Sequence, residues 1–350
     1  MNDSATPSIS VIVPCRNERY SIEACLRSIL GQECASPGFE VIVVDGMSQD
    51  GTREILKALA EEDPRFRIVD NPDRITPCGM NVGIRAARGR YIAIMGAHSE
   101  YAPDYLRTCV ELLEEHPEVC CTGGPIISRG KGVFGRAVAA VMSHPVGIGN
   151  AKHRLPNYEG NAEGACFPMF RREIFDEVGL FDESLFRNQD DELNYRIALA
   201  GGKIFISPRA RATYSVRESP RKLFLQYSQY GYWRVAVLKK HRMPASVRHV
   251  VPIAFFGLMI VLLGGGLFLP GWWRVTAAVL PAGYASILVA AGAQVGWKRG
   301  IVVGCAFPIV AAIIHVAYAI GFGWGLLEGH RAFAPSGREG FDAARIRTHQ

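Results

Sequence analysis

One long stretch of the sequence lacks charge. From Val250 to Leu327 the only charged residues are Arg274, Lys298 and Arg299, whereas the preceding chain is rich in them. A buried helix of a soluble protein is rarely so long and so apolar, and about twenty apolar residues suffice to cross a bilayer. The composition therefore argues against a wholly soluble protein and indicates a polar part followed by a membrane part.

The cysteines also lack any recognisable pattern. The nine cysteines include no C-x-x-C pair and no Cys/His spacing typical of a metal site, and Cys120 and Cys121 are adjacent. This argues against a disulfide framework and against a zinc site. We therefore expect reduced thiols in a cytosol-facing domain, most of them small core residues.

Three further motifs are missing. Residues 1–8 hold no apolar core of a secretory signal peptide, so none is expected. No aromatic RNP-type motif accompanies the net charge of +6, and the basic clusters at 217–222 and 234–242 favour an anionic membrane surface over nucleic acid. No glycine- and lysine-rich phosphate loop follows the first apolar run, which counts against a nucleotidyltransferase.

The polar part alternates between two kinds of segment. Short, β-branched apolar runs predict buried strands at 9–14, 39–45, 66–69 and 91–95. Apolar residues at helical spacing predict helices at 21–30, 52–60 and 80–87. This alternation predicts an α/β fold with a mainly parallel sheet, whose ligands bind beyond the carboxyl ends of the strands. Polar residues follow three of those ends: Arg16, Glu18, Asp45, Asp50, His98 and Glu100.

Three consecutive acidic residues, Asp190 to Glu192, precede a helical spacing of Leu193 and Arg196. We expect them at the N-terminus of a helix, where the helix dipole and unpaired backbone N–H groups stabilise carboxylates. Such a cluster can take a proton from a sugar hydroxyl. An ordinary acidic helix cap explains the same pattern.

Four motifs, in order, resemble those of family 2 glycosyltransferases of the GT-A fold. They are Ser10–Glu18, Val43–Thr52, Gly179–Glu183 and Gln189–Arg196. The resemblance extends over about residues 8–240. Within the family the chain is most similar to the succinoglycan-biosynthesis type of membrane-bound exopolysaccharide glucosyltransferase, because of His98, the loop His144–Arg154 and the apolar tail. The resemblance implies a Rossmann-like GT-A domain that transfers a sugar from a nucleotide sugar.

The resemblance also implies roles for single residues. Pro14, Arg16 and Glu18 would line the nucleotide pocket, and Asp45 would belong to the nucleotide-binding strand end. A carboxylate can accept hydrogen bonds from a uracil N–H or from ribose hydroxyls. Asp50 is either part of this site or only the capping acid of the next helix.

The chain departs from the family pattern at two places. Gly46 stands where most relatives carry a second aspartate, so the base contact usually assigned to that aspartate does not carry over. Gly96-Ala97-His98 replaces the Asp-x-Asp that normally holds a divalent metal against the diphosphate. A neutral imidazole can ligate Mn²⁺ but suits Mg²⁺ poorly. Three interpretations stay open: His98 binds a divalent metal, assisted or not by Glu100; His98 or a nearby cation contacts phosphate; or the metal site is lost.

On the acceptor side, the resemblance implies that Asp190 is the general base, with Asp191 as the second candidate. The base would deprotonate the acceptor hydroxyl as it attacks the anomeric carbon, which inverts the configuration while the diphosphate leaves. Metal or cations must offset the charge of the leaving group. Arg74, Arg154 and Arg234 are candidates, and a solvated surface arginine is the alternative for each.

The membrane part is expected to contain an interfacial helix and membrane spans. Pro220–His241 interleaves aromatic and basic residues, which predicts an amphipathic helix with aromatics toward lipid and cations toward head groups. Three apolar stretches are each long enough to span a bilayer: 250–269, 275–295 and 301–327. Lys298 and Arg299 would lie on the cytoplasmic side with the catalytic domain, although three spans conflict with a basic tail on the far side. The expected domains are catalytic (1–215), interfacial (216–249), transmembrane (250–327) and a polar tail (328–350).

These features together predict a membrane-bound, inverting, nonprocessive glycosyltransferase of a bacterial-type inner membrane, multi-pass, with a cytoplasmic catalytic domain. It would use a nucleotide sugar, UDP-linked, and Mn²⁺ or Mg²⁺ to extend a polyprenyl-linked glycan in exopolysaccharide biosynthesis. Gln229–Arg234 departs from the Gln-x-x-Arg-Trp motif of processive synthases, which favours single-sugar transfer. The alternative is a non-catalytic membrane scaffold in a polysaccharide assembly complex, which the missing Asp-x-Asp favours and the Asp190 cluster opposes.

Overall fold

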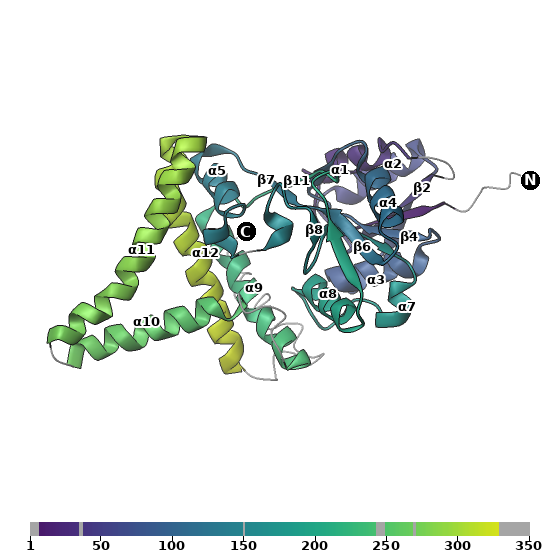
Figure 1. Cartoon of the computed structure of the whole chain (residues 1–350). Coiled ribbons are helices and arrows are strands. Elements are labelled where there is room, and N and C mark those ends of the chain that lie inside the picture. The colour runs from purple at the N-terminus through teal and green to yellow at the C-terminus, as the bar shows by residue number, and fades with distance from the viewer. Residues whose placement is uncertain (1–6, 35–37, 150, 243–248, 269–270, 329–350) are drawn as a thin grey trace, which may run out of the picture. The chain divides into compact units, whose positions relative to one another are not determined.

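The computed structural model describes residues 7–34, 38–149, 151–242, 249–268 and 271–328 (Figure 1). These residues form two compact units. An α/β unit holds the residues up to 127 together with 151–215, and a helical unit holds 128–149 together with the residues from 216 onward. The segment 128–149 thus belongs to the helical unit although it interrupts the sequence of the α/β unit.

The α/β unit is built on an eight-stranded sheet in the order β3-β2-β1-β4-β9-β6-β10-β8. Its strands are β1 (Ile9–Cys15), β2 (Phe39–Asp45), β3 (Phe66–Asp70), β4 (Tyr91–Ile94), β6 (Val119–Gly124), β8 (Gly160–Asn161), β9 (Cys166–Arg171) and β10 (Lys203–Ile206). β9 is antiparallel to both of its neighbours and β8 is antiparallel to β10, while β3, β2, β1 and β4 pair in parallel, as do β6 and β10. The expected mainly parallel sheet is confirmed. A three-stranded sheet has the order β5 (Ser99–Tyr101), β11 (Ala212–Ser215) and β7 (Ile126–Arg129).

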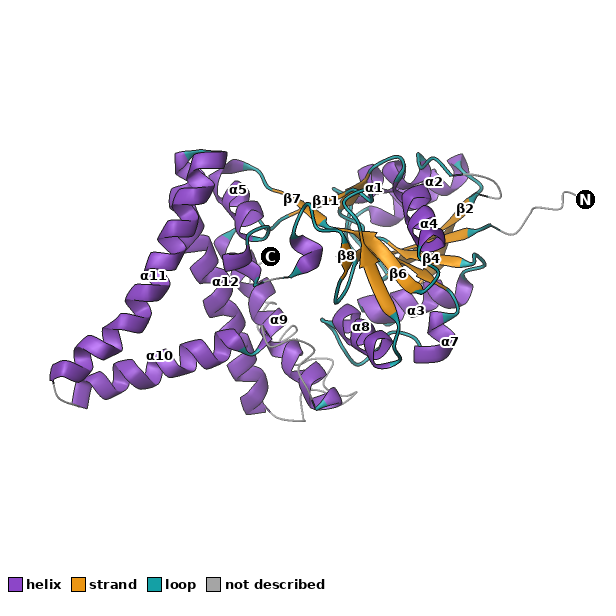
Figure 2. Ribbon diagram, in the orientation of Figure 1, coloured by secondary structure: helices purple, strands orange, loops and turns teal. Residues whose placement is uncertain are grey.

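Helices cover both faces of the large sheet (Figure 2). Because successive side chains of a strand point to opposite faces, Val11 and Val13 pack in one core and Ile12 packs in the other. The first core includes side chains of α1 (Ile22–Leu30), α2 (Thr52–Glu62) and α4 (Tyr105–Glu115). The second includes side chains of α3 (Thr76–Ala86), α7 (Ile174–Val178) and α8 (Gln189–Leu199). The carboxyl ends of the parallel strands are thereby left at one edge between two helical layers.

The predicted strands and helices of the first hundred residues are present, with shifted ends. β1 continues through Pro14 to Cys15. α3 begins at Thr76, before the expected start at Met80, because Pro77 is well suited to the first turn of a helix, where its missing N–H costs nothing. Sequence periodicity thus identified the type of each element better than its boundary.

The helical unit comprises α5 (Gly132–Val141), α6 (Pro145–Ile148), α9 (Pro220–His241), α10 (Val251–Phe268), α11 (Gly271–Arg299) and α12 (Ile301–Glu328) (Figure 1). Among the described residues, α11 and α12 are long and apolar enough to cross a membrane, whereas the apolar part of α10 is shorter. The predicted count of three spans is therefore not supported. Trp272 and Trp273 lie in the first turn of α11, which begins at Gly271, four residues before the expected span.

Helix α9 packs closely on α12 through glycines. A Cβ at Gly231 would lie 2.1 Å from the carbonyl oxygen of Tyr318, so no other residue permits this approach without a shift of the backbone. Tyr232 and Trp233 are buried within the helical unit. The expectation that the aromatic side chains of this segment point outward is therefore wrong for these two residues, because they fill the helix packing instead.

Candidate active site

Hydrogen bonds join the two loops that follow β1 and β2. The N–H of Asn17 donates to Ser48 Oγ at 2.9 Å, and the N–H of Glu18 donates to Thr52 Oγ1 at 2.9 Å. Asn17 adopts a left-handed conformation (φ 55°), which asparagine tolerates better than most residues. The paired loops hold Glu18 at the carboxyl edge of the sheet, where the sequence predicted a nucleotide pocket.

Asp45, the last residue of β2, is fully buried. Its carboxylate accepts hydrogen bonds from the N–H and hydroxyl of Ser48 and from Arg53 Nη1 at 2.8 Å. Arg53 also binds Asp70, which lies beside Asp45 at the end of β3. Asp45 therefore holds the loop after β2 in place, and its direct contact with a nucleotide stays a prediction.

Asp50 acts as a local cap in this structure. Its Oδ1 accepts from the N–H of Thr52 at 3.1 Å, and its Oδ2 accepts from the N–H of Arg19 at 3.2 Å. Gly51 in a left-handed conformation (φ 99°) precedes Thr52, the first residue of α2. Of the two interpretations of Asp50, these contacts favour the structural one.

Arg16 crosses directly over Gly46. A Cβ at Gly46 would lie 3.1 to 3.3 Å from the Cβ, Cγ and Cδ atoms of Arg16. The exposed guanidinium of Arg16 donates to the carbonyl oxygen of Arg74 at 3.5 Å. Pro14, the other predicted pocket residue of β1, lies beside Gly79 of α3. The glycine that replaces the expected second aspartate thus provides the space in which the Arg16 side chain lies.

His98 lies beside Glu18. Its Nδ1 is 3.5 Å from Glu18 Oε1, and the two side chains are 36% and 29% exposed. Glu18 Oε2 accepts from the Ser21 hydroxyl at 2.8 Å, and the His98 ring packs edge-on against Tyr214. Glu100 is exposed in β5. The structure therefore brings together two residues that the sequence assigned to different roles, one to the nucleotide pocket and one to a metal.

The space next to Gly96 is filled. A Cβ at Gly96 would lie 3.1 Å from the ring of Phe167, so a carboxylate at this position requires that ring to move. Among the residues that the structure describes, no group of three or more His, Cys, Asp or Glu side chains could hold a metal ion. His98 and Glu18 offer one nitrogen and one carboxylate, a donor set that Mn²⁺ accepts. Because substrate phosphates complete the coordination in many such sites, two protein ligands fit a metal bound together with a diphosphate.

The acidic residues occupy the first turn of α8, as predicted. Asp190 is exposed and accepts from the N–H of Asp191 at 2.9 Å. Glu192 is fully buried and binds Arg196 Nη2 at 2.9 Å. Arg196 also donates to the carbonyl oxygen of Leu180 at 2.7 Å. Glu192 and Arg196 therefore hold α8 against the segment that follows α7, whereas Asp190 is partly in water.

Cys166 connects the two halves of the site. It is the first residue of β9, which starts at the edge where the parallel strands end, and the next residue, Phe167, packs on Gly96. Burial raises the pKa of the Cys166 thiol to about 12, Arg154 acts to lower it, and both aspartates of the α8 turn act to raise it. Cys166 Sγ lies 4.0 Å from the carbonyl oxygen of His153, the neighbour of Arg154, and a Cβ at Gly164 would lie 2.4 Å from Asn194 Nδ2 of α8. His98, Arg154 and the α8 turn are therefore grouped around the start of β9.

The three arginine candidates lie in different places. Arg154 ends the short helix η1 (Lys152–Arg154) of the α/β unit and is half-buried. Arg74 is exposed in the loop before α3, in a left-handed conformation (φ 61°). Arg234 is buried in α9 of the helical unit. Because its neighbour His153 lies 4.0 Å from Cys166 at the start of β9, Arg154 is favoured among the candidates of the α/β unit.

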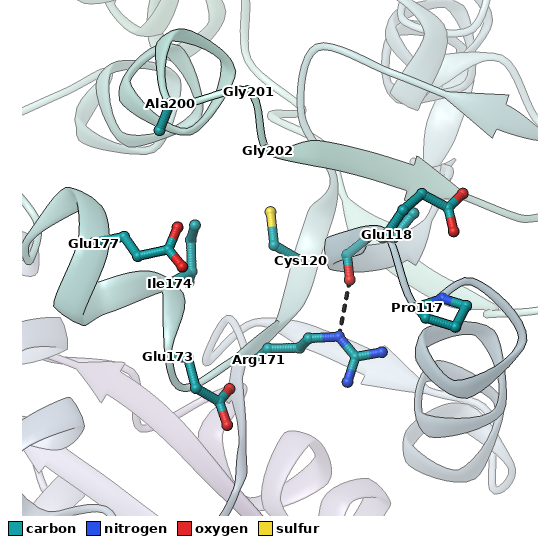
Figure 3. A pocket seen from close by; sticks show the side chains of 11 residues that line it. Pro117, Glu118, Cys120, Arg171, Glu173, Ile174, Glu177, Ala200, Gly201 and Gly202 are labelled. Atoms are coloured by element: carbon teal, nitrogen blue, oxygen red, sulfur yellow. Dashed lines mark hydrogen bonds between the residues drawn. The ribbon is translucent and has the colours of Figure 1, made fainter.

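A pocket of about 290 Å³ lies at the opposite edge of the sheet (Figure 3). It is lined at the starts of β6 and β10 by Cys120 and Gly202, with Arg171, Glu173 and Glu177 around it. Arg171 Nε donates to the carbonyl oxygen of Val119 at 3.0 Å, so this arginine supports the wall. The pocket contains none of the predicted site residues and lies away from the carboxyl ends of the parallel strands.

Arg53 is a residue of the site region that the sequence interpretation missed. A signal for it existed, because Asp45 ends one predicted strand and Asp70 directly follows the next. In the structure the two carboxylates lie side by side at strand ends, and Arg53, the second residue of α2, binds both. Phe167 had no such signal, because its packing on Gly96 joins segments far apart in sequence.

Helices cover both faces of the parallel sheet, and the loops after β1, β2 and β4 lie at one edge of it together with the acidic start of α8. These features define the class of protein to which the chain belongs. The chain matches the model of Glycosyl transferase family 2 over residues 10–179. It belongs to this family, and it is a glycosyltransferase with a GT-A-like fold.

Two relatives align with nearly the whole chain. The succinoglycan biosynthesis protein ExoA of Rhizobium meliloti is 32% identical over 95% of this chain and 99% of its own. The second relative is the dolichyl N-acetyl-alpha-D-glucosaminyl phosphate 3-beta-D-2,3-diacetamido-2,3-dideoxy-beta-D-glucuronosyltransferase of Methanococcus voltae. It is 24% identical over 93% of this chain and 99% of its own. Among solved structures, the mannosyltransferase PcManGT of Pyrobaculum calidifontis, in complex with GDP-Man and Mn²⁺, is similar with a TM-score of 0.58. It shares 22% identity over 91% of this chain and 88% of its own. At this level of identity the similarity shows the fold alone.

Proposed function

We propose that this protein transfers single sugars, with inversion, from a UDP-linked donor to a polyprenyl-linked glycan during exopolysaccharide biosynthesis. One observation supports this most directly. Phe167 packs on the loop that carries His98, while Gly164, just before β9, packs on Asn194 of α8, one helical turn after Asp190. A donor-side loop and a carboxylate pair are thus adjacent at one edge, as sugar transfer requires.

The aspartates of α8 provide the base for this reaction. Asp190 Oδ accepts the proton of the acceptor hydroxyl while the hydroxyl oxygen attacks the anomeric carbon, and the bond from that carbon to the diphosphate breaks on the opposite face. Exposure leaves this carboxylate accessible, and its place in the first turn of α8 favours a negative charge. Asp191, half-buried beside it, is the second candidate.

The donor side holds the nucleotide diphosphate. Arg16 and Pro14 would contact the nucleoside, and Arg154 would offset diphosphate charge. His98 and Glu18 would hold Mn²⁺ or Mg²⁺, which when bound neutralises charge on the leaving diphosphate.

The helical unit attaches the enzyme to a membrane in this proposal, with the α/β unit on the cytoplasmic side. The most apolar windows of α11 and α12 are only 24% and 39% buried, in contrast to core helices of soluble proteins. Large apolar side chains such as Val275, Trp297 and Ile301 are 68%, 93% and 72% exposed. Apolar surface of this extent requires a lipid or protein cover.

The acceptor class is taken from the relatives. The Rhizobium relative is named for succinoglycan biosynthesis, and the Methanococcus relative is named for a dolichyl-phosphate-linked sugar. Both align with almost the entire chain, including the helical unit. A lipid-linked glycan as acceptor agrees with a catalytic unit joined to membrane-type helices.

The experiment is sugar transfer by detergent-purified protein. Radiolabelled UDP-glucose, UDP-galactose and UDP-N-acetylglucosamine are each supplied with a lipid extract of the source membranes, and label is followed into the lipid fraction. Wild type is expected to transfer one of these sugars, and Asp190→Asn is not. No transfer by the wild type from any nucleotide sugar favours the second candidate, a non-catalytic scaffold, to which the filled space at Gly96 already points.

A further inference from the structure

Two tyrosines of the α/β unit are buried beside the loop that carries His98. Tyr101 is the last residue of β5, and Tyr105 is the first residue of α4. Their rings meet edge-on with centroids 5.3 Å apart, and the ring of Phe167 meets that of Tyr101 edge-on at 5.2 Å. Tyr101, Tyr105 and Phe167 are called the aromatic clamp below. The proposed transfer mechanism gives none of them a role.

Tyr101 closes the loop that carries His98. Its hydroxyl accepts from the N–H of Gly96 at 2.7 Å and donates to the carbonyl oxygen of the same glycine at 3.3 Å. Cys25 Sγ lies 3.2 Å from that carbonyl oxygen. Burial raises the pKa of the Tyr101 hydroxyl far above its usual value, so this group stays protonated and able to donate. The side chain at the end of the loop therefore fixes the backbone at its beginning.

Strand pairing fixes the far end of the same loop. β5 pairs with β11, and Ser99 lies opposite Tyr214. The ring of His98, the residue before this strand, packs edge-on against Tyr214 with centroids 5.5 Å apart. His98 is thus held between a fixed glycine and a paired strand, with Nδ1 at 3.5 Å from Glu18 Oε1.

Tyr105 holds the start of β9. Its hydroxyl donates to the carbonyl oxygen of Phe167 at 2.7 Å and lies 3.3 Å from the carbonyl oxygen of Cys166. Phe167 has a left-handed backbone conformation (φ 50°), which is unfavourable for a bulky residue and persists where the surroundings impose it. The bond from Tyr105 and the contacts of the ring with Tyr101 and Gly96 impose it here. Strain of this kind is concentrated at functional sites.

The aromatic clamp connects the two sides of the proposed site. Tyr101 fixes the His98 loop, which belongs to the donor side, and Tyr105 fixes the start of β9. The segment just before β9 packs on α8, since a Cβ at Gly164 would lie 2.4 Å from Asn194 Nδ2. Because α8 carries the proposed base, the ring contact between the two tyrosines joins the donor side to the acceptor side.

We infer that Tyr101 and Tyr105 are positioning residues for sugar transfer, which hold the His98 loop and the start of β9 at a fixed distance from each other. The inference rests on the proposed function, because the clamp joins the donor and acceptor sides of that site. His98 and Glu18 give a metal two protein ligands, so the position of each is critical. Residues that orient metal ligands commonly contribute about tenfold to a hundredfold to metal affinity.

Hydrogen exchange tests the clamp without any substrate or metal. Tyr101→Phe keeps the ring and removes the acceptor of the Gly96 N–H. Exchange of this amide, followed by mass spectrometry of overlapping peptides, is expected to be about tenfold faster than in the wild type. Tyr91→Phe is the matched control, because Tyr91 is also buried and its hydroxyl binds Glu114 at the start of β4. It should leave exchange at Gly96 unchanged.

Binding and transfer measurements separate the roles of the two hydroxyls. Tyr101→Phe is expected to weaken binding of Mn²⁺ in the presence of UDP about tenfold, measured by electron paramagnetic resonance, and to leave UDP affinity without Mn²⁺ unchanged. Tyr105→Phe should leave Mn²⁺ binding unchanged and lower kcat/KM for the membrane lipid extract about tenfold, because it acts on the acceptor side. Tyr91→Phe should change neither readout.

Gly96→Ala perturbs the same loop if Tyr101→Phe fails to fold. Its methyl group would lie 3.1 Å from the Phe167 ring and should displace the ring, so Mn²⁺ binding should weaken here too. Unchanged Mn²⁺ binding in folded Tyr101→Phe and Gly96→Ala would overturn the inference, as would an equal defect in Tyr91→Phe. If the wild type binds UDP with Mn²⁺ and these variants do so equally well, the proposed function stands and the clamp is refuted. A wild type that binds no UDP refutes both.

Discussion

The end of β2 and the first turn of α8 both present carboxylates near one edge of the sheet, and they use them differently. Asp45 at the end of β2 is 0% exposed, and Ser48 and Arg53 surround its oxygens. Asp190 at the start of α8 is exposed. Within that same turn, Glu192 is 0% exposed and holds Arg196.

The difference leads us to expect that burial, more than sequence motif, separates structural from reactive carboxylates. A buried carboxylate with several donors is occupied by its protein partners, so it can neither easily accept a further hydrogen bond nor meet a substrate. A carboxylate partly in water can do both. The following substitutions test whether buried and exposed carboxylates have these different roles.

The largest expected effect is that of Asp190→Asn on transfer. An amide cannot accept the acceptor's proton, so kcat should fall about a thousandfold while the melting temperature stays close to that of the wild type. Asp191→Asn is the matched control and should retain most of the activity. Steady-state rates of lipid-linked sugar formation measure both. A full loss in Asp191→Asn with normal rates in Asp190→Asn would exchange the two roles.

Arg196→Ala should reduce stability, the property that Asp190→Asn leaves unchanged. The substitution removes the partner of a fully buried Glu192, which we expect to lower the free energy of unfolding by about 3 kcal/mol or more. Arg27→Ala, which breaks exposed pairs with Glu23 and Glu62, should cost far less. Chemical denaturation monitored by circular dichroism compares them. Similar losses in both variants would contradict the structural role of the Glu192 pair.

Gly46→Ala tests the packing of Arg16 on the donor side. The new methyl group would lie 3.1 to 3.3 Å from three atoms of the Arg16 side chain and should displace it, lowering the affinity for UDP about tenfold. In an Arg16→Ala background the same substitution should add nothing, because the displaced group is absent. Calorimetric titration with UDP measures all four proteins. Additive effects of the two substitutions would show that Gly46 acts without Arg16.

The smallest expected effect concerns pH and Glu40. Burial acts to raise the pKa of this carboxyl group, but hydrogen bonds from Ser10 and Arg88 and the charge of Arg67 outweigh burial and lower it. A pKa lowered on folding gives stability that is present above the unfolded value and is lost as the pH falls through the folded value. The free energy of unfolding of the wild type should therefore fall more than that of Glu40→Gln between pH 7 and pH 3. Equal losses in urea unfolding would contradict this.

The sequence allowed much of the α/β unit to be predicted. The strand at Phe39–Asp45 matches β2 residue for residue, and the acidic residues 190–192 lie in the first turn of α8 as expected. Both follow from local patterns, namely a β-branched run and an acidic helix start. The mainly parallel sheet then follows from the alternation of strands and helices.

Contacts between distant segments could not be predicted. His98 meets Glu18 across eighty residues, and Phe167 fills the space at Gly96 across seventy-one. Neither contact leaves a periodic trace in the sequence. The grouping of residues 128–149 with the helical unit has the same origin, because it depends on helix packing.

The most direct test of the account is calorimetric binding of UDP to the detergent-purified protein with and without Mn²⁺, comparing wild type with His98→Ala. We expect binding by the wild type that is strengthened by Mn²⁺, and loss of that strengthening in the variant. This result would place a nucleotide and its metal at the edge formed by the β1, β2 and β4 loops. No binding of UDP by the wild type under either condition would contradict the account.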